Sequence, residues 1–151
     1  MYIRVVKPRA WVRLADGGAV AIDEAVAELT RQGPRASVFA CSSRTDLELV
    51  AVGFSAGRPH PQPLHFVSVH DEDLGVAGVE VLHSEGRTPL PEANRLHRDL
   101  DLSGERARRL VAHLAARRVS VETVREGELK RLARALHAAG QPIPAESWLL
   151  R

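Results

Sequence analysis

A serine in a short glycine-rich segment is the first candidate for chemistry. Residues 53–57 read Gly-Phe-Ser-Ala-Gly and match G-x-S-x-G, the pattern that holds a serine nucleophile on a sharp turn between a strand and a helix. Three prolines at alternate positions between residues 58 and 64 prevent the helix whose N-terminus would help to stabilise an oxyanion. We therefore interpret the segment as a turn that ends a strand, and a small serine hydrolase that uses Ser55 stays an alternative.

The histidines, the cysteine and the glycines do not form a recognised ligand or cofactor motif. Of the seven histidines, His70 and His83 come nearest to a metal site, together with Asp71 and Asp73, but the spacing of known zinc motifs is absent. Cys41 lies in an apolar segment and is expected to be a small core residue, because a reactive thiolate needs an electropositive, partly exposed position. Phosphate-binding glycine motifs are absent as well. The sequence therefore predicts neither a metal site nor a cofactor, and it favours a non-enzyme without deciding the question.

Positive charge in the C-terminal part of the chain is the most visible candidate for binding. Residues 104–134 contain nine basic and four acidic side chains. The helical spacing predicts a basic face suited to an acidic protein or a phosphate backbone, made of Arg106, Arg109, His113, Arg117, Lys130 and Arg134. Arginine occurs 19 times and lysine twice, a bias typical of GC-rich codons that indicates a bacterial genome and explains part of this charge. Binding to another protein is therefore favoured, with nucleic-acid binding through these helices as the alternative.

A second candidate binding site is a compact polar group in a long connection. It consists of Asn94, His97 and Arg98. Residues 84–102 around them are predicted to be irregular, and loops carry binding residues more often than regular elements do. These side chains are equally suited to cap turns or to brace the connection, so the sequence leaves both roles open.

Length and composition place the chain among globular proteins with a single domain. It has 151 residues, of which 44% are hydrophobic and 26% charged, and its net charge is +2. A single cysteine excludes an internal disulfide and favours a reducing compartment. No apolar run reaches the ~18 residues of a membrane span, and the first residues lack the pattern of a signal peptide. We therefore expect one cytoplasmic domain over 1–151 with no membrane partner.

Periodicity and turn residues predict strands and one helix in the first half. Apolar patterns favour strands over 2–6, 11–14, 38–41, 47–54, 64–70 and 76–83. Residues 47–54 are apolar on both faces, which is typical of a strand at the centre of a sheet. A polar hairpin turn is expected at 43–46 and an acidic turn at 71–73. One short helix is expected to follow Asp23 as its N-cap and to end at Gln32.

The second half reads as mostly helical. Ser103 is expected to cap a helix that runs to Arg118 and buries one apolar stripe, made of Ala107, Leu110, Val111, Leu114 and Ala115. A last helix is expected over 126–139 and an extra strand over 119–124. The tail over 141–151 is apolar at Trp148-Leu149-Leu150, and we expect it to dock on the core or on a partner.

Together these elements predict an α+β fold. We expect a largely antiparallel sheet of about four to six strands, with one short N-terminal helix and two longer C-terminal helices packed on it. The apolar centre of this sheet needs a cover on both faces. The tail, or a second copy of the chain in a homodimer, would supply it.

The favoured function is that of a small cytosolic bacterial protein-binding or accessory module without catalytic activity. The reason is that no nucleophile, acid–base pair or ligand set is evident, whereas long charged helices and an apolar tail offer surface. Such a module would act as a regulatory subunit or a neutraliser of its partner. That partner would be another protein or a second copy of this chain.

Overall fold

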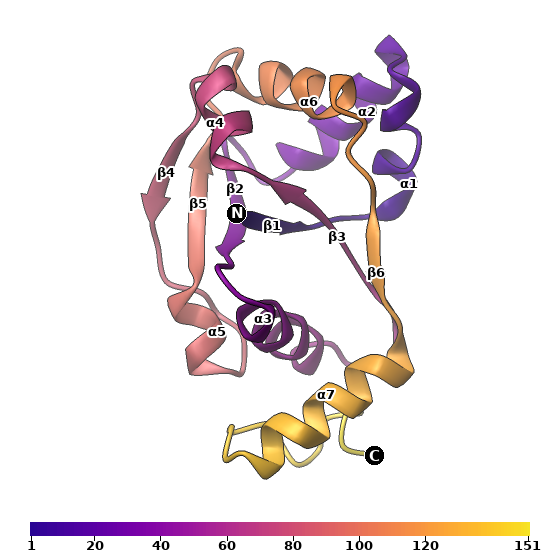
Figure 1. Ribbon diagram of the computed structural model, residues 1–151, viewed down its shortest axis with the longest axis vertical. Coiled ribbons are helices and arrows are strands. Elements are labelled where there is room, and N and C mark those ends of the chain that lie inside the picture. Colours follow the sequence, from indigo (N-terminus) through magenta and orange to yellow (C-terminus); the bar gives the residue numbers. More distant parts are fainter.

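The computed structural model describes residues 1–151 and shows one six-stranded antiparallel sheet with helices on both faces (Figure 1). The strands are β1 (Tyr2–Val5), β2 (Arg35–Ala40), β3 (Leu64–Val69), β4 (Glu80–His83), β5 (His97–Asp101) and β6 (Glu122–Val124). Their order in the sheet is β4-β5-β2-β1-β3-β6, and every neighbouring pair is antiparallel. The predicted α+β class with a largely antiparallel sheet is confirmed.

The helices form a layer on each face of the sheet. They are α1 (Pro8–Trp11), α2 (Ala19–Leu29), α3 (Arg44–Ala56), α4 (Asp71–Ala77), α5 (Pro91–Arg95), α6 (Arg106–Ala116) and α7 (Glu126–Ala138), with a short 3-10 helix, η1 (Leu14–Asp16). In Figure 1, α1, α2, α4 and α6 lie on one side of the sheet and α3, α5 and α7 on the other. The two longer C-terminal helices are present as predicted, but they pack on opposite faces. None of the helices combines the length and the apolar character needed to cross a membrane.

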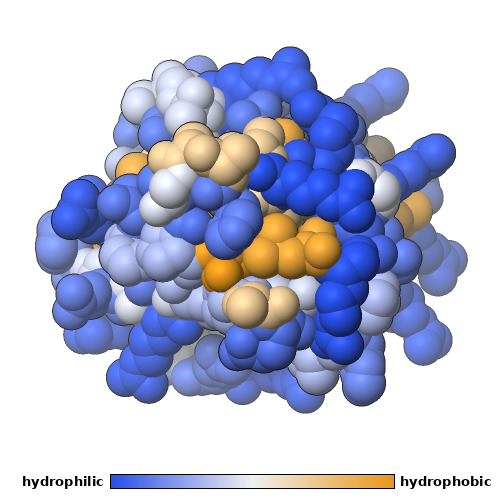
Figure 2. Space-filling model, turned by 90° about the horizontal axis from the view of Figure 1, so that it is seen from below, coloured by the Kyte–Doolittle hydropathy of each residue, from blue (hydrophilic) through white to orange (hydrophobic).

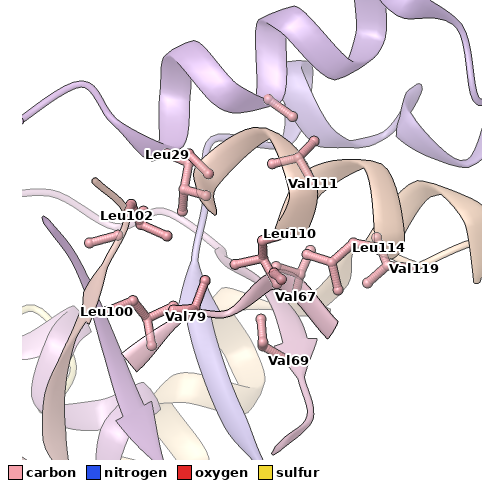
Figure 3. Packing of buried hydrophobic residues seen from close by; sticks show 14 of the residues in the cluster. Leu29, Val67, Val69, Val79, Leu100, Leu102, Leu110, Val111, Leu114 and Val119 are labelled. Atoms are coloured by element: carbon pink, nitrogen blue, oxygen red, sulfur yellow. The ribbon is translucent and has the colours of Figure 1, made fainter. Parts of the chain in front are cut away.

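The largest core cluster lies between the sheet and the helices α2 and α6 (Figure 3). Val67 and Leu100 from the strands point toward Leu29, Leu110 and Leu114 from the helices. The predicted apolar stripe of α6 is confirmed, because all of its residues are at most 5% exposed. Each buried leucine contributes roughly 1.5–3 kcal/mol of transfer free energy, so α6 is held to the sheet mainly by this stripe.

A second core cluster packs α3, α5, α7 and the C-terminal tail together. The predicted docking of the tail is confirmed: Trp148 is 4% exposed, and its indole Nε1 donates to the carbonyl oxygen of Ser55 at 3.2 Å. α7 and the tail leave Leu136 and Leu150 half-buried, and this end of the molecule shows an apolar patch within a hydrophilic surface (Figure 2). Because the tail is buried within its own chain, its docking requires no second copy.

The predicted central strand over 47–54 is wrong, because these residues belong to α3. The helix begins at a capping box: the Ser43 hydroxyl accepts a hydrogen bond from the Asp46 amide at 3.1 Å, and the Asp46 carboxylate accepts one from the Ser43 amide at 3.0 Å. The expected hairpin turn at 43–46 is therefore the start of a helix. α3 is apolar on several sides because it packs against the sheet, α5 and α7, and a buried helix shows this pattern as readily as a buried strand.

The expected acidic turn at 71–73 is also the start of a helix, α4. The Asp73 carboxylate accepts a hydrogen bond from the His70 amide at 2.7 Å, and the acidic residues of this first turn interact favourably with the helix dipole. Gly78 ends the helix in the left-handed conformation, with a φ of 66°. Of the strand predicted over 76–83, only Glu80–His83 (β4) belong to the sheet.

The irregular connection predicted over 84–102 is wrong in its second half, which contains α5 and β5. β5 lies inside the sheet, between β4 and β2. Only Leu100 of this strand is fully buried. His97 and Asp99 line a cleft, which explains why a strand inside the sheet has a polar sequence.

Smaller differences concern the ends of elements. The strand expected over 11–14 is replaced by the end of α1 and by η1. α2 begins after Gly18, so Asp23 lies inside the helix and is not its cap. The cap position of α6 is Glu105 and not Ser103. The other predicted elements are confirmed to within a few residues: the strands over 2–6, 38–41 and 64–70, the extra strand within 119–124 and the helix over 126–139.

Candidate binding cleft

The sheet opens between β1 and β2. These strands pair over only two residues of each, whereas β1 pairs with β3 along its whole length. Arg4 fills the opening: its Nη1 donates to the Ser37 carbonyl oxygen at 2.9 Å, an acceptor that a paired strand would otherwise use. Burial lowers the pKa of Arg4, and the nearby Glu28 carboxylate counteracts this effect. The Arg4 side chain thus replaces a backbone hydrogen bond between β1 and β2.

A cleft of about 820 Å³ lies beside this opening. Its walls are the connection from α2 to β2, the C-terminal end of α3, part of β5 and the segment 85–89. Six cationic and three acidic side chains line it: Arg4, Lys7, Arg31, Arg35, Arg58 and Arg87, with Glu28, Glu85 and Asp99. The cleft therefore carries an excess of positive charge.

Most of the cleft cations have no ion-pair partner within the chain. Arg4 has a carboxylate nearby, Glu28 at 4.0 Å, and Glu28 is itself held by the Trp11 indole, whose Nε1 donates to it at 2.9 Å. The other cleft cations form no ion pair, namely Lys7, Arg31, Arg35, Arg58 and Arg87. Arginine binds carboxylates and phosphates through paired, charge-assisted hydrogen bonds. The cleft is therefore suited to an anionic group.

Arg58 is held in place at the edge of the cleft. Its Nη1 donates to the Pro63 carbonyl oxygen at 3.1 Å, and its guanidinium carbon lies 4.9 Å from the centre of the Phe54 ring, within the range of a cation–π interaction. Burial lowers the pKa of Arg58. The proline-rich segment that follows α3 thus places a carbonyl group against this guanidinium.

The side chains of Asn94 and Arg98 form hydrogen bonds with backbone groups of nearby residues. Asn94 binds both sides of the Thr88 backbone: its Oδ1 accepts from the Thr88 amide at 2.7 Å, and its Nδ2 donates to the Thr88 carbonyl oxygen at 2.9 Å. Arg98 donates to the carbonyl oxygens of Arg95 at 2.9 Å and His97 at 2.6 Å. Neither side chain lines the cleft, but Thr88 does. Asn94 therefore contacts a residue of the cleft wall without lining the cleft itself.

His97 is the one predicted loop residue that lines the cleft itself. Its Nδ1 lies 2.9 Å from the Ser84 hydroxyl oxygen, and its ring meets Phe39 edge-on, with ring centres 5.3 Å apart. Burial lowers the pKa of His97, and the nearby Asp99 counteracts this effect. His97 therefore lines the cleft with a side chain that Ser84 and Phe39 contact.

The predicted basic face is divided by the fold, since α6 and α7 lie on opposite sides of the sheet (Figure 1). Arg106 pairs with Asp101 and with Glu80. Lys130 donates to the carbonyl oxygen of Arg151 at 3.0 Å. Two of the six predicted residues are exposed and make no side-chain hydrogen bond or ion pair, Arg109 and Arg134.

His113 and Arg117 are both directed at Asp73, a carboxylate that is 2% exposed. Arg117 donates to it from Nε at 2.7 Å and from Nη2 at 2.8 Å, and the His113 Nε2 lies 3.2 Å from it. Burial would raise the pKa of Asp73, but the bonds from Arg117 and from the His70 amide hold the pKa below its usual value. His113 and Arg117 therefore join α6 to α4.

Ser55 does not have the surroundings of a nucleophile. It lies in α3 with its side chain fully buried, and its Oγ has no hydrogen-bond partner. The preceding Gly53 has a packing role, because a Cβ there would lie 2.9 Å from the Ala93 Cβ, so glycine lets α3 approach α5. Cys41 is 3% exposed, and burial raises the pKa of its thiol to about 12, which agrees with the expected core role.

A second groove on the surface lacks this excess of charge. A groove of about 460 Å³ beside α3 and α7 is lined by two cations and two carboxylates, Arg44, Arg125, Glu48 and Glu128. Arg44 and Glu48 pair with each other at 3.0 Å. No group of three or more histidine, cysteine, aspartate or glutamate side chains is placed to hold a metal ion.

The cleft cations were not predicted from the sequence, because they come from separate segments that only the fold brings together. A weak signal was present at Arg35 and Arg58, which follow Gly33-Pro34 and Gly57. Loops next to regular elements are common places for binding residues. Arginine is so frequent in this chain that its position alone could not identify a site.

The role of this cleft has to be inferred from its own geometry. Comparison with known proteins finds no match for the chain among family models, curated proteins or solved structures.

Proposed function

We propose that the protein is a non-catalytic binding module that takes an acidic segment of a partner protein into the cleft. One observation supports this most strongly. Five cations without an ion pair surround a single cleft of about 820 Å³. The bacterial cytosol, and the role of a regulatory subunit or neutraliser, are the proposed setting because the codon bias and the single cysteine favour them.

The size of the cleft fits several side chains of a partner. Binding sites for ligands commonly occupy roughly 300–1,000 Å³, so the cleft can hold a short run of residues. Carboxylates in that run would meet the exposed guanidinium groups of Arg31, Arg35 and Arg87. Their charge-assisted hydrogen bonds would orient the partner.

An acidic protein segment is favoured over a nucleic acid. Single-stranded nucleic acids need accessible aromatic rings on which bases stack. The cleft offers two phenyl rings, of which Phe39 is 4% exposed and Phe54 is paired with Arg58.

The candidate nucleophiles Ser55 and Cys41 have no role in the proposed binding. Ser55 and Cys41 are buried and do not line the cleft. His97 and Asp99 are the cleft groups nearest to acid–base chemistry, and the proposal assigns them to binding.

Fluorescence anisotropy with a fluorescein-labelled octaglutamate peptide tests the proposal. The double variant Arg31→Glu, Arg35→Glu reverses two exposed cleft charges that make no side-chain bond in the structure. We expect it to weaken binding about ten-fold or more, and we expect wild-type binding to weaken as salt is added.

The matched control is Arg109→Glu, Arg134→Glu, which makes the same charge change on exposed, unbonded residues outside the cleft. Its affinity should stay within about two-fold of wild type. Equal losses in the two double variants, or no binding of octaglutamate at all, would contradict the proposal. Tighter binding of an oligothymidylate of equal charge would point to nucleic acid instead.

A further inference from the structure

One wall of the cleft is a loop without regular structure. It comprises residues 84–90, between β4 and α5, and we call it the wall loop. Four of its residues line the cleft, Glu85, Arg87, Thr88 and Pro89. Arg87 is exposed and makes no side-chain hydrogen bond or ion pair. Its guanidinium is therefore available to a bound anion.

The wall loop is fixed from behind by Asn94 of α5. The carboxamide of Asn94 pairs with both backbone groups of Thr88, at 2.7 Å and 2.9 Å. The Thr88 Oγ1 lies 2.8 Å from the same Asn94 Oδ1, and the Gly86 amide donates to the Asn94 carbonyl oxygen at 3.2 Å. Asn94 thus binds the loop on both sides of Arg87.

Gly86 shows how closely the loop lies against Asn94. A Cβ at position 86 would stand 2.8 Å from the Asn94 Oδ1 and 2.9 Å from the Asn94 Cα. Only glycine allows this approach. A side chain at Gly86 would therefore push the loop away from α5.

We propose that Asn94 is a positioning residue that holds the wall loop so that Arg87 faces the bound anion. This inference rests on the proposed function of the cleft. Asn94 makes no contact with the ligand and acts only through Arg87. Loss of the Asn94 side chain removes the hydrogen bonds to Thr88, and a more mobile Arg87 then has to be ordered again when the ligand binds.

A double-mutant cycle with fluorescein-labelled octaglutamate tests this inference. We expect Arg87→Ala to weaken binding about five-fold, the loss of one charged contact. Asn94→Ala should weaken binding by roughly three- to five-fold in wild type and by less than about 1.5-fold in the Arg87→Ala background. A purely structural role would instead give the same loss in both backgrounds. Thermal unfolding of each variant checks that the fold is intact.

Gly86→Ala provides an independent second variant if Asn94→Ala does not fold. It displaces the loop from Asn94 while residue 94 stays asparagine, and its effect on binding should also vanish in the Arg87→Ala background. The inference is overturned if Asn94→Ala and Gly86→Ala bind octaglutamate like wild type while Arg31→Glu, Arg35→Glu does not. In that case the proposed function stands. Failure of the wild-type protein to bind would overturn the proposed function itself.

Discussion

Asp73 joins two helices through a carboxylate that water hardly reaches. It accepts hydrogen bonds from Arg117 and from the His70 amide. Its pKa lies below its usual value, so the folded state takes up a proton at this site less readily than the unfolded chain does. The stability that Asp73 contributes is therefore present above the ordinary carboxyl pKa and is lost as the pH falls through the lowered pKa.

Asp73→Asn is expected to reduce the free energy of unfolding by about 2 kcal/mol at neutral pH, because hydrogen bonds to a charged partner are lost. The difference from wild type should shrink as the pH falls below about 4, the ordinary carboxyl pKa, because the unfolded wild-type chain then binds a proton that the folded state takes up only at lower pH. Urea unfolding over a series of pH values measures both effects. Asp23→Asn is the control, since Asp23 pairs with Arg108 at 2.6 Å in an exposed position, and such pairs contribute little. A stability difference that does not change with pH would show that Asp73 has another role.

At the scale of elements, α3 shows where the sequence pattern is ambiguous. Residues 47–54 are apolar on both faces, and this pattern fits a strand inside a sheet as well as a helix between layers. The capping box at Ser43 and Asp46 is the local signal that distinguishes a helix from a strand here. The same polar residues are also common in hairpin turns, so the signal is ambiguous in the sequence. α6 and α7 were predictable because their apolar residues follow a helical period with a polar opposite face.

The capping box provides a test of this element. Ser43→Ala should lower the free energy of unfolding by about 1 kcal/mol, because the Asp46 amide loses its acceptor. Thr45→Ala is the control, since Thr45 is exposed in the same first turn and makes no side-chain hydrogen bond. Chemical denaturation of the two variants measures the difference. Equal stabilities would mean that the cap does not hold the start of α3.

At the scale of the whole molecule, the cleft exists because the sheet opens and two layers of helices leave that opening accessible. Arg4 from β1, Arg35 from β2 and Arg58 after α3 meet there. The fold class could be predicted from the sequence, because burial and turn residues decide it locally. The cleft could not be predicted, because its position depends on where the pairing of β1 and β2 ends. It also depends on β5, which was not recognised as a strand because its sequence is polar.

The central claim is that an acidic segment binds in this cleft, and its location can be measured directly. Amide NMR spectra of the isotope-labelled protein, recorded while octaglutamate is added, report which residues contact the peptide. The proposal predicts that the largest shifts fall at Arg35, Ser37 and Gly57, with little change at Arg109 and Arg134. Shifts confined to α6 and α7, with unchanged amides around the cleft, would contradict it.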